Sequence, residues 1–526
     1  MGECMELKEF SRQGTVPRAS WRLGVTIIWL AFLGVTVFLW QLGDIGLIDE
    51  TEPLFAEAAR GMVETGDWLT PYFNEATRFD KPPLVYWLMA IGYSLLGFNE
   101  WAVRLPSALS AIALLGFCCY TLQRYCSWRA GWLGAAVLAL NLQMAIWGRT
   151  GVSDMLLNAC IGGTLLCFFC GYAKPDRHCQ DPQDSQPYSQ KWHWYPQNAW
   201  YWGAYVCSAL AILTKGPVGL VLPGLIVLVF IVYTGQWRAV FGELGLPGGF
   251  LLLSAIALPW FIAIAHEHGS NYLETFFGYH NFERFTSVVN LHSAPWYFYF
   301  GVVLVGFAPW SAYLPFALAK QQIWRRRWLT RQPRHTHLGL FASCWFAVIF
   351  LFFTIAVTKL PSYTLPLLPA AALLIALALE PADATRASDS APRSDLGLHI
   401  SAWFNVAIAL VFAIVLWFGP GWIGYDPADP NLGERLARSG LPQRASLIWL
   451  LATVGTAIIV LWRPPHWQRG LLAPSLVAFL AFAWLFISPT YILLDEARQL
   501  HLRQLAAIAS KTVRPNERIV MVGWRL

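Results

Sequence analysis

Charged residues are scarce in this sequence. Of its 526 residues only 13% are charged, while 56% are hydrophobic and 15% are aromatic. A soluble globular domain carries about 25% charged residues. This shortage excludes an ordinary soluble protein of this length. Apolar runs of about 20 residues recur along the chain instead, and they predict a polytopic membrane protein.

The apolar runs predict about 13 membrane-spanning helices, with the short neighbouring runs left open. The candidate spans lie near residues 23–42, 83–98, 104–123, 130–147, 155–172, 199–213, 216–234, 247–265, 296–316, 338–356, 363–380, 399–419, 444–462 and 471–489. The sequence lacks a small-residue cleavage site after Trp21 to Trp40, so we expect the first span to remain as an anchor.

The excess of basic residues does not indicate a nucleic-acid partner. The net charge is +6, but the basic residues gather in short loops between apolar runs. They are Arg12, Arg18, Arg22, Arg124, Arg129, Arg325, Arg326, Arg327, Arg331 and Arg334. Loops rich in Arg and Lys face the cytoplasm, and the first loop after residue 42 therefore lies outside.

Clear metal or disulfide patterns are also missing. Cys167 and Cys170 have a two-residue spacing, but they fall inside an apolar run and indicate packing. His266 and His268 flank Glu267, and alternate residues on a helix point to different faces. A divalent metal therefore remains an open question for the sequence.

Most of the ionisable chemistry sits in one loop, residues 44–105. Asp49 or Thr51 can cap a helix that carries Pro53 in its first turn. The apolar spacing then predicts an amphipathic helix at the membrane surface that ends at Gly66. The pair Asp80-Lys81 follows, directly before the next apolar run. We expect Asp49, Glu50, Asp80 and Lys81 to converge on the outer side.

Three further ionisable residues stand at the edges of apolar runs. Asp154 begins one run and is either a helix cap or a functional acid. Lys215 and Lys359 each stand beside a proline that interrupts a run, and each either snorkels to the interface or contacts an anion. If every run from 83 to 147 crosses once, Asp154 emerges opposite Asp49. For the two acids to meet, one run must be short, tilted or re-entrant, or two runs must merge.

At this point the sequence resembles a known family. IDETEPLFAEAARGMVETGDWLTPYFN, FDKPPLVYWL and EWAVRLPSAL look like the first extracytoplasmic loop of GT-C type integral-membrane glycosyltransferases. The nearest branch is the bacterial aminoarabinose (lipid A) transferase-like family, which is related to the protein O-mannosyltransferases. GRTGVSDMLL, LTKGPVGLVLP, HNFERF and KLPSYTLPLLPA match in order further on. Several ordered motifs are more specific than any one of them.

The resemblance implies an all-α polytopic GT-C fold with amphipathic juxtamembrane helices in the first loop. It implies an inverting transfer of a sugar from a polyprenyl-phosphate (undecaprenyl-phosphate) donor. The acceptor would be a lipid A-like molecule or another glycan or lipid. The reaction would occur at the periplasmic face of a bacterial inner membrane, and the partners would be the donor, the acceptor and membrane lipid.

The resemblance also implies roles for individual residues. Asp49 is the expected base, Glu50 the fallback, and Asp154 orients the sugar or the acceptor. The expected substrate contacts are Lys81, Asp80, Arg60, Tyr72, Lys215, Arg284, His280, Lys359 and Tyr363. Relatives carry an acidic residue before histidine in the second loop. Here the pair is His280-Asn281, so metal ligation is not inherited at this position.

We expect residues 1–490 to form the transmembrane domain, with a first catalytic loop at 43–82 and a second polar loop at 266–295. Residues 491–526 resemble the opening helix and strand of an extracytoplasmic α/β domain that is otherwise truncated or lost. A protein O-mannosyltransferase is the alternative enzyme. A lipid or sugar transporter is an alternative of another class, which predicts inverted repeats that we do not find in the sequence.

Overall fold

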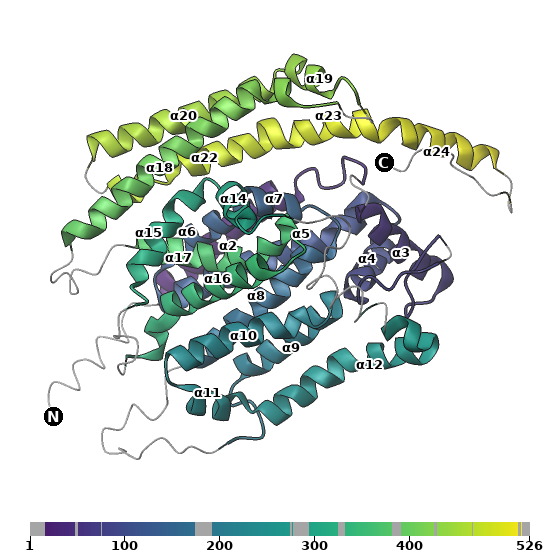
Figure 1. The fold of residues 1–526 in the computed structure, drawn as a ribbon, viewed down its shortest axis with the longest axis horizontal. Helices are drawn as coiled ribbons and strands as arrows, with labels where there is room; N and C mark the ends of the chain where they lie inside the picture. The colour runs from purple at the N-terminus through teal and green to yellow at the C-terminus, as the bar shows by residue number, and fades with distance from the viewer. Residues whose placement is uncertain are drawn as a thin grey trace.

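A computed structural model describes residues 16–47, 51–74, 76–173, 192–273, 276, 294–324, 332–380, 391–425, 429–464, 467–513 and 517. The described chain is almost entirely helical (Figure 1), and its only strands there are β1 (Tyr72–Phe73) and β2 (Ala76–Thr77), which form an antiparallel hairpin. Among the described residues, nine helices are long and apolar enough to cross a membrane. The bent pair Phe298–Gly306 and Trp310–Gln321 would make a tenth. The protein is therefore a multi-pass membrane protein.

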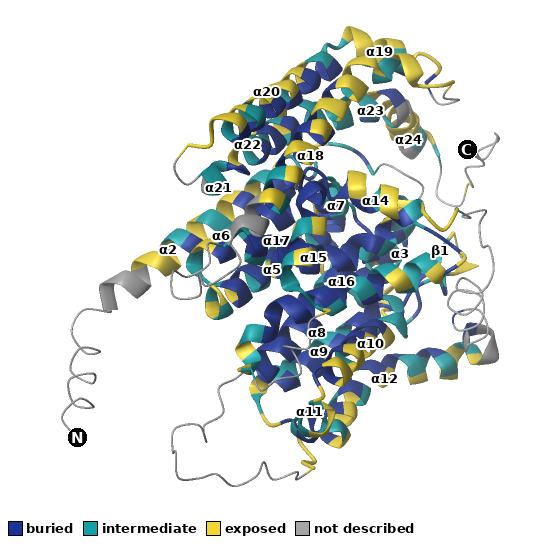
Figure 2. Ribbon diagram, turned by 60° about the vertical axis from the view of Figure 1, so that its left-hand side comes forward, coloured by how far each residue is buried: buried dark blue, intermediate teal, exposed yellow. Residues whose placement is uncertain are grey.

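The long helices form a bundle with a layer against it. The bundle contains α2 (Val16–Leu33), α5 (Glu100–Tyr125), α8 (Ser153–Tyr172), α12 (Leu246–Leu273), α16 (Leu338–Ile355) and α17 (Leu368–Leu379). The layer along one side in Figure 1 contains α18 (Ala391–Phe418), α20 (Leu441–Trp462), α22 (Ala473–Phe482) and α23 (Ser488–Arg498). Many of the layer's large apolar side chains are exposed, as Figure 2 shows, and this is the pattern of a surface that faces lipid.

Shorter helices complete the bundle. They are α6 (Trp128–Ala139), α7 (Leu142–Trp147), α9 (Ala199–Lys215), α10 (Val218–Tyr233), α11 (Trp237–Leu244), α14 (Phe298–Gly306) and α15 (Leu314–Gln321). Asn141 divides α6 from α7: its side chain caps α7 at the Met144 N–H and donates to the Leu138 carbonyl. This cap explains why the apolar run 130–147 forms two helices.

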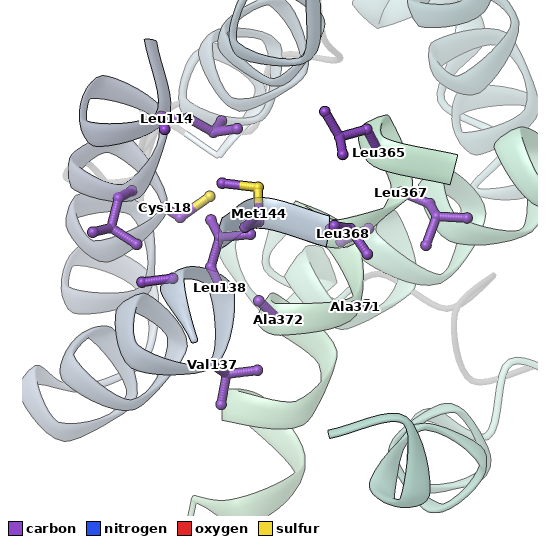
Figure 3. Packing of buried hydrophobic residues seen from close by; sticks show 14 of the residues in the cluster. Leu114, Cys118, Val137, Leu138, Met144, Leu365, Leu367, Leu368, Ala371 and Ala372 are labelled. Carbon is purple, nitrogen blue, oxygen red and sulfur yellow. The ribbon is translucent and has the colours of Figure 1, made fainter. Parts of the chain in front are cut away.

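The core lies where α5, α6, α7 and α17 meet. Figure 3 shows side chains from these helices packed against one another, including Leu114, Cys118, Leu138, Met144 and Ala372. All five are buried. Small residues on α17 allow close approach of α6, which is the usual way that helices associate when lipid supplies no hydrophobic driving force.

The amphipathic helix predicted in the first loop is α3 (Thr51–Thr65). Phe55, Ala58, Ala59 and Met62 are buried on one face, and Gly66 follows the helix with φ +75°. The next apolar run forms α4 (Leu84–Leu96), which has only 13 residues. In Figure 1, α3 and α4 lie together at one end of the bundle.

α4 does not cross the membrane, which resolves the conflict over Asp154. Arg104, in the first turns of α5, donates to the carbonyls of Leu42 and Gly46, which follow the first span. The chain thus leaves α4 on the side on which it entered. The run 83–98 thus returns to the end of the bundle at which it began. α5 leads to the other end, where Tyr125 contacts Cys170 of α8, and α6 with α7 leads back to the first end, where Asp154 begins α8.

The chain ends with α23 and α24 (Leu500–Thr512). The apolar helical segment Ala473–Ala497 runs across residue 490, and the domain boundary expected there stays a prediction. The strand expected after it falls almost wholly outside the described residues.

Candidate functional site

An ion pair joins Asp154 and Lys215 at the end of the bundle where α8 begins and α9 ends. The Lys215 ammonium donates to the Asp154 carboxylate at 2.8 Å, and each side chain is only 17% exposed. Asp154 lies in the first turn of α8 and Lys215 is the last residue of α9. Gly216, with φ +84°, ends α9, and Pro217 begins the turn into α10. Two antiparallel helices therefore place opposite charges at the same level.

The segment between α16 and α17 forms the second wall of this site. Ser362 hydrogen-bonds the Asp154 carboxylate, and the Lys215 ammonium stands 5.6 Å from the centre of the Tyr363 ring. Lys359 is buried in the same segment, 7% exposed, where it donates to the Thr354 and Ala356 carbonyls. Burial lowers the pKa of Lys359.

The first loop contributes a third set of charges. Lys81 donates to Asp80 at 2.6 Å, and Arg78 pairs with the same carboxylate at 3.1 Å. The charge of Lys81 also acts on Asp154. Five residues expected at the site, Asp80, Lys81, Asp154, Lys215 and Tyr363, therefore form one network, and Lys359 lies on its edge.

This network has more positive than negative charge. Lys81, Lys215 and Arg78 pair with two carboxylates, in a site of low exposure where electrostatic interactions are strong. Such an arrangement can accept an anionic group such as a phosphate. The two carboxylates keep the lysines oriented when no anion is present.

The other expected residues do not join this network within the described chain. Arg60 lies on the exposed face of α3 and pairs with Glu57 and Glu64, and Tyr72 belongs to the β1–β2 hairpin. Asp49, Glu50, His280 and Arg284 lie outside the described residues.

Sequence reasoning missed the buried pair Glu52–Arg104. The guanidinium contacts both carboxylate oxygens, at 2.8 and 2.9 Å, and the side chains are 2% and 4% exposed. Glu52 also accepts the Gly151 N–H at 2.6 Å. The pair thus holds the start of α3 against both α5 and the loop before Asp154. An arginine at the edge of the run 104–123 was the signal that could have revealed it.

Arg149 was missed as well. Its guanidinium donates to the carbonyls of Val37 and Gln41, at the end of the first span. Burial lowers its pKa to about 10. Arg104 and Arg149 therefore bind the backbone that leads into the first loop from two directions.

The described residues also bear on whether this site could hold a metal ion. In the described part of the chain, His, Cys, Asp and Glu nowhere form a group of three that could hold a metal ion. The His268 ring nitrogen Nε2 instead bonds the Thr70 hydroxyl at 2.9 Å. Asp80 and Asp154 each pair with a lysine, and this charge disfavours a bound cation. These residues do not fit a metal, and we derive no step through one.

Comparison with known proteins gives concordant results. A family model for dolichyl-phosphate-mannose-protein mannosyltransferases matches residues 80–178. The chain is 30% identical over 66% of its length to an undecaprenyl phosphate-alpha-4-amino-4-deoxy-L-arabinose arabinosyl transferase of Proteus mirabilis, and 29% identical over 82% of its length to one of Erwinia tasmaniensis. The matched parts cover 58% and 71% of those relatives, and 64% of one from Shewanella sediminis.

A solved structure has the same fold. It is that of ArnT from Cupriavidus metallidurans bound to undecaprenyl phosphate, and the TM-score is 0.67 with 24% sequence identity. The match covers 94% of this chain and 81% of that one. The ordered motifs, the matched relatives and the fold agree, and this membrane protein is similar to the aminoarabinose transferases.

Proposed function

We propose that this protein transfers a sugar from an undecaprenyl-phosphate donor to a lipid A-like acceptor at the outer face of the inner membrane. The observation that carries the proposal is the network in which Lys81 and Lys215 meet around Asp154, beside the buried Lys359. The relatives named as undecaprenyl phosphate-aminoarabinose transferases support the donor class.

The reaction is a single displacement. The acceptor oxygen attacks the anomeric carbon, the bond from this carbon to the phosphate oxygen breaks, and undecaprenyl phosphate leaves with the bonding electrons. A base takes the acceptor proton, and cations stabilise the phosphate as its charge develops. Inversion at the anomeric carbon follows from one displacement.

We assign the base role to Asp49, with Glu50 as the fallback. The residues on either side of this pair are held by buried contacts: Gly46 through Arg104 and Asp495, and Glu52 through Arg104. A base must lie within hydrogen-bond reach of the proton that it takes. The described residues that flank Asp49 in the sequence, Gly46 and Glu52, both contact Arg104, and this supports the role.

Lys81, Lys215 and Lys359 bind the donor phosphate in this proposal, and Tyr363 borders the sugar. Asp154 holds Lys215 in position through the ion pair. We keep Arg60, Asp80, Tyr72, His280 and Arg284 as proposed substrate contacts. Arg284 and His280 would approach from the second polar loop.

We also propose thirteen membrane crossings. The nine long helices and the bent pair make ten. Helices α9 and α10 have 17 and 16 residues, or about 25 Å at 1.5 Å per residue, and α6 with α7 forms a broken span. We keep residues 1–490 as the proposed transmembrane domain, with the network on its periplasmic side. Residues 491–526 begin a separate unit.

Transfer of radiolabel from an undecaprenyl-phosphate sugar to total membrane lipid and protein tests the function. Wild type should label lipid, and Asp49→Asn should lower the rate by about 10²–10⁴-fold. Glu57→Gln, on the exposed face of α3, is the matched control and should behave as wild type. Normal transfer in Asp49→Asn would move the base to Glu50.

Protein O-mannosylation is the second candidate, because the mannosyltransferase family model matches residues 80–178. It predicts label on serine or threonine rather than on lipid. Translocation of the donor without transfer would indicate the transporter alternative, which has no other support.

A further inference from the structure

A cavity lies away from the Asp154 network, toward the opposite end of the bundle. It has a volume of about 370 Å³ and lies between α2, α6, the end of α17, α21 (Trp467–Gly470) and the start of α22. Figure 2 shows α21 and α22 above α2 and α6. Its lining includes Trp29, Trp132, Leu133, Leu476, Arg129 and Glu380. The volume falls in the range of small-molecule sites.

The cavity faces the inner leaflet. The α17 helix follows Tyr363, which belongs to the outer network, and ends at Leu379 on the cavity wall. Arg129 belongs to the basic connection between α5 and α6, which the positive-inside rule places in the cytoplasm. A ligand here is therefore separated from the donor site by the length of a transmembrane helix.

One wall of the cavity is aromatic. Trp29 and Trp132 stack with ring centres 5.3 Å apart, and Trp128 lies 4.6 Å from Trp132. The indole N–H groups of Trp128 and Trp132 both donate to the Thr26 hydroxyl. Their polar atoms are thus satisfied within the protein. The parts of these rings that line the cavity offer apolar surface to an acyl chain.

The cavity lining carries one charge of each sign, Arg129 and Glu380. Lys320 of α15 also acts electrostatically on Glu380, but its ammonium donates to the Ala378 carbonyl at 2.5 Å. A guanidinium suits a phosphate diester, and a carboxylate suits a primary ammonium.

We propose that this cavity binds phosphatidylethanolamine of the inner leaflet. Its phosphate contacts Arg129, its ammonium contacts Glu380, and its acyl chains lie along Trp29, Leu133 and Leu476. Phosphatidylethanolamine is preferred to phosphatidylcholine because its primary ammonium donates hydrogen bonds to a carboxylate, whereas the quaternary ammonium of choline has no N–H to donate. Phosphatidylethanolamine is also preferred to phosphatidylglycerol, because Glu380 would repel the net negative charge of that lipid.

Native mass spectrometry of the full chain in detergent tests the proposal. After removal of lipid, dioleoyl phosphatidylethanolamine, phosphatidylcholine or phosphatidylglycerol is added. One phosphatidylethanolamine should bind, about fivefold more tightly than either competitor, which corresponds to about 1 kcal/mol. Equal binding of all three lipids, or preferred binding of phosphatidylglycerol, would overturn the assignment.

Three variants locate the site. Arg129→Gln should weaken binding of all three lipids, whereas Glu380→Gln should abolish only the preference for ethanolamine. Ala473→Phe fills the cavity from an exposed lining position and should remove the bound lipid. Arg238→Gln is the matched control, an exposed arginine of α11 on the same side of the membrane. Unchanged binding in Arg129→Gln and Ala473→Phe, or an equal loss in the control, contradicts this site.

Discussion

The Asp495 carboxylate accepts a hydrogen bond from the Gly46 backbone N–H at 2.8 Å, although 449 positions separate the two residues. Asp495 is buried in α23 and also pairs with Arg503 of α24. Gly46 stands three residues before the proposed base Asp49. The last described helices therefore hold the backbone that leads into the proposed catalytic loop.

The first prediction concerns this contact. Asp495→Ala leaves the Gly46 N–H without its acceptor. An unsatisfied buried donor costs about 1–3 kcal/mol of folding free energy. Because the effect falls on the loop, the turnover rate should drop about tenfold while the melting temperature changes little. Arg503→Gln, which keeps the acceptor, should retain most activity. Kinetics of label transfer and thermal unfolding measure both, and equal rates in wild type and Asp495→Ala would refute the role.

The Asp154–Lys215 pair gives a second prediction. Asp154→Asn leaves Lys215 without its carboxylate, and Lys215→Met leaves Asp154 without its ammonium. Each change should lower kcat/KM by more than about tenfold. Expressed as free energies, the loss of kcat/KM in the double variant should be smaller than the sum of the losses in the two single variants. The difference, the coupling energy, should be about 0.5–3 kcal/mol. A double-mutant cycle measures this, and strictly additive losses would show that the pair does not act as a unit.

The Glu52–Arg104 pair should act on stability. Removing one partner leaves a buried charge, and Glu52→Gln should destabilise the fold by about 3–5 kcal/mol. Arg60→Gln on the exposed face of α3 should change stability by less than about 1 kcal/mol. Thermal unfolding in detergent compares the two. A similar melting temperature for both variants would contradict the anchoring role.

Lys359 predicts a pH dependence of donor binding. Because burial lowers its pKa, Lys359 loses its charge at a lower pH than the ordinary value of about 10.4. Affinity for the phosphate-bearing donor should therefore fall as the pH rises through this lowered pKa.

Lys359→Arg stays charged throughout and should keep its donor affinity at high pH. Lys359→Gln should bind weakly at every pH. The donor KM measured from pH 7 to 10 distinguishes the three proteins. A wild-type profile that matches that of Lys359→Arg would exclude Lys359 from the phosphate site.

The sequence alone indicated a membrane protein, the amphipathic helix over 51–65 and most residues of the charged network. Apolar runs and helical spacing are local patterns, and local chain geometry is enough to interpret them. Lys215 and Lys359 were identifiable because a charge among apolar residues is costly unless it finds a partner.

Only the tertiary structure decided which runs cross the membrane and which charges meet. Run 83–98 is as apolar as a span, but the bonds from Arg104 to Leu42 and Gly46 keep both its ends on one side. Glu52 pairs with Arg104, which lies 52 residues further along the chain, and Asp154 pairs with Lys215, which lies 61 residues further along. Such pairs depend on how helices pack in space, and hydropathy along one chain carries no information about that packing.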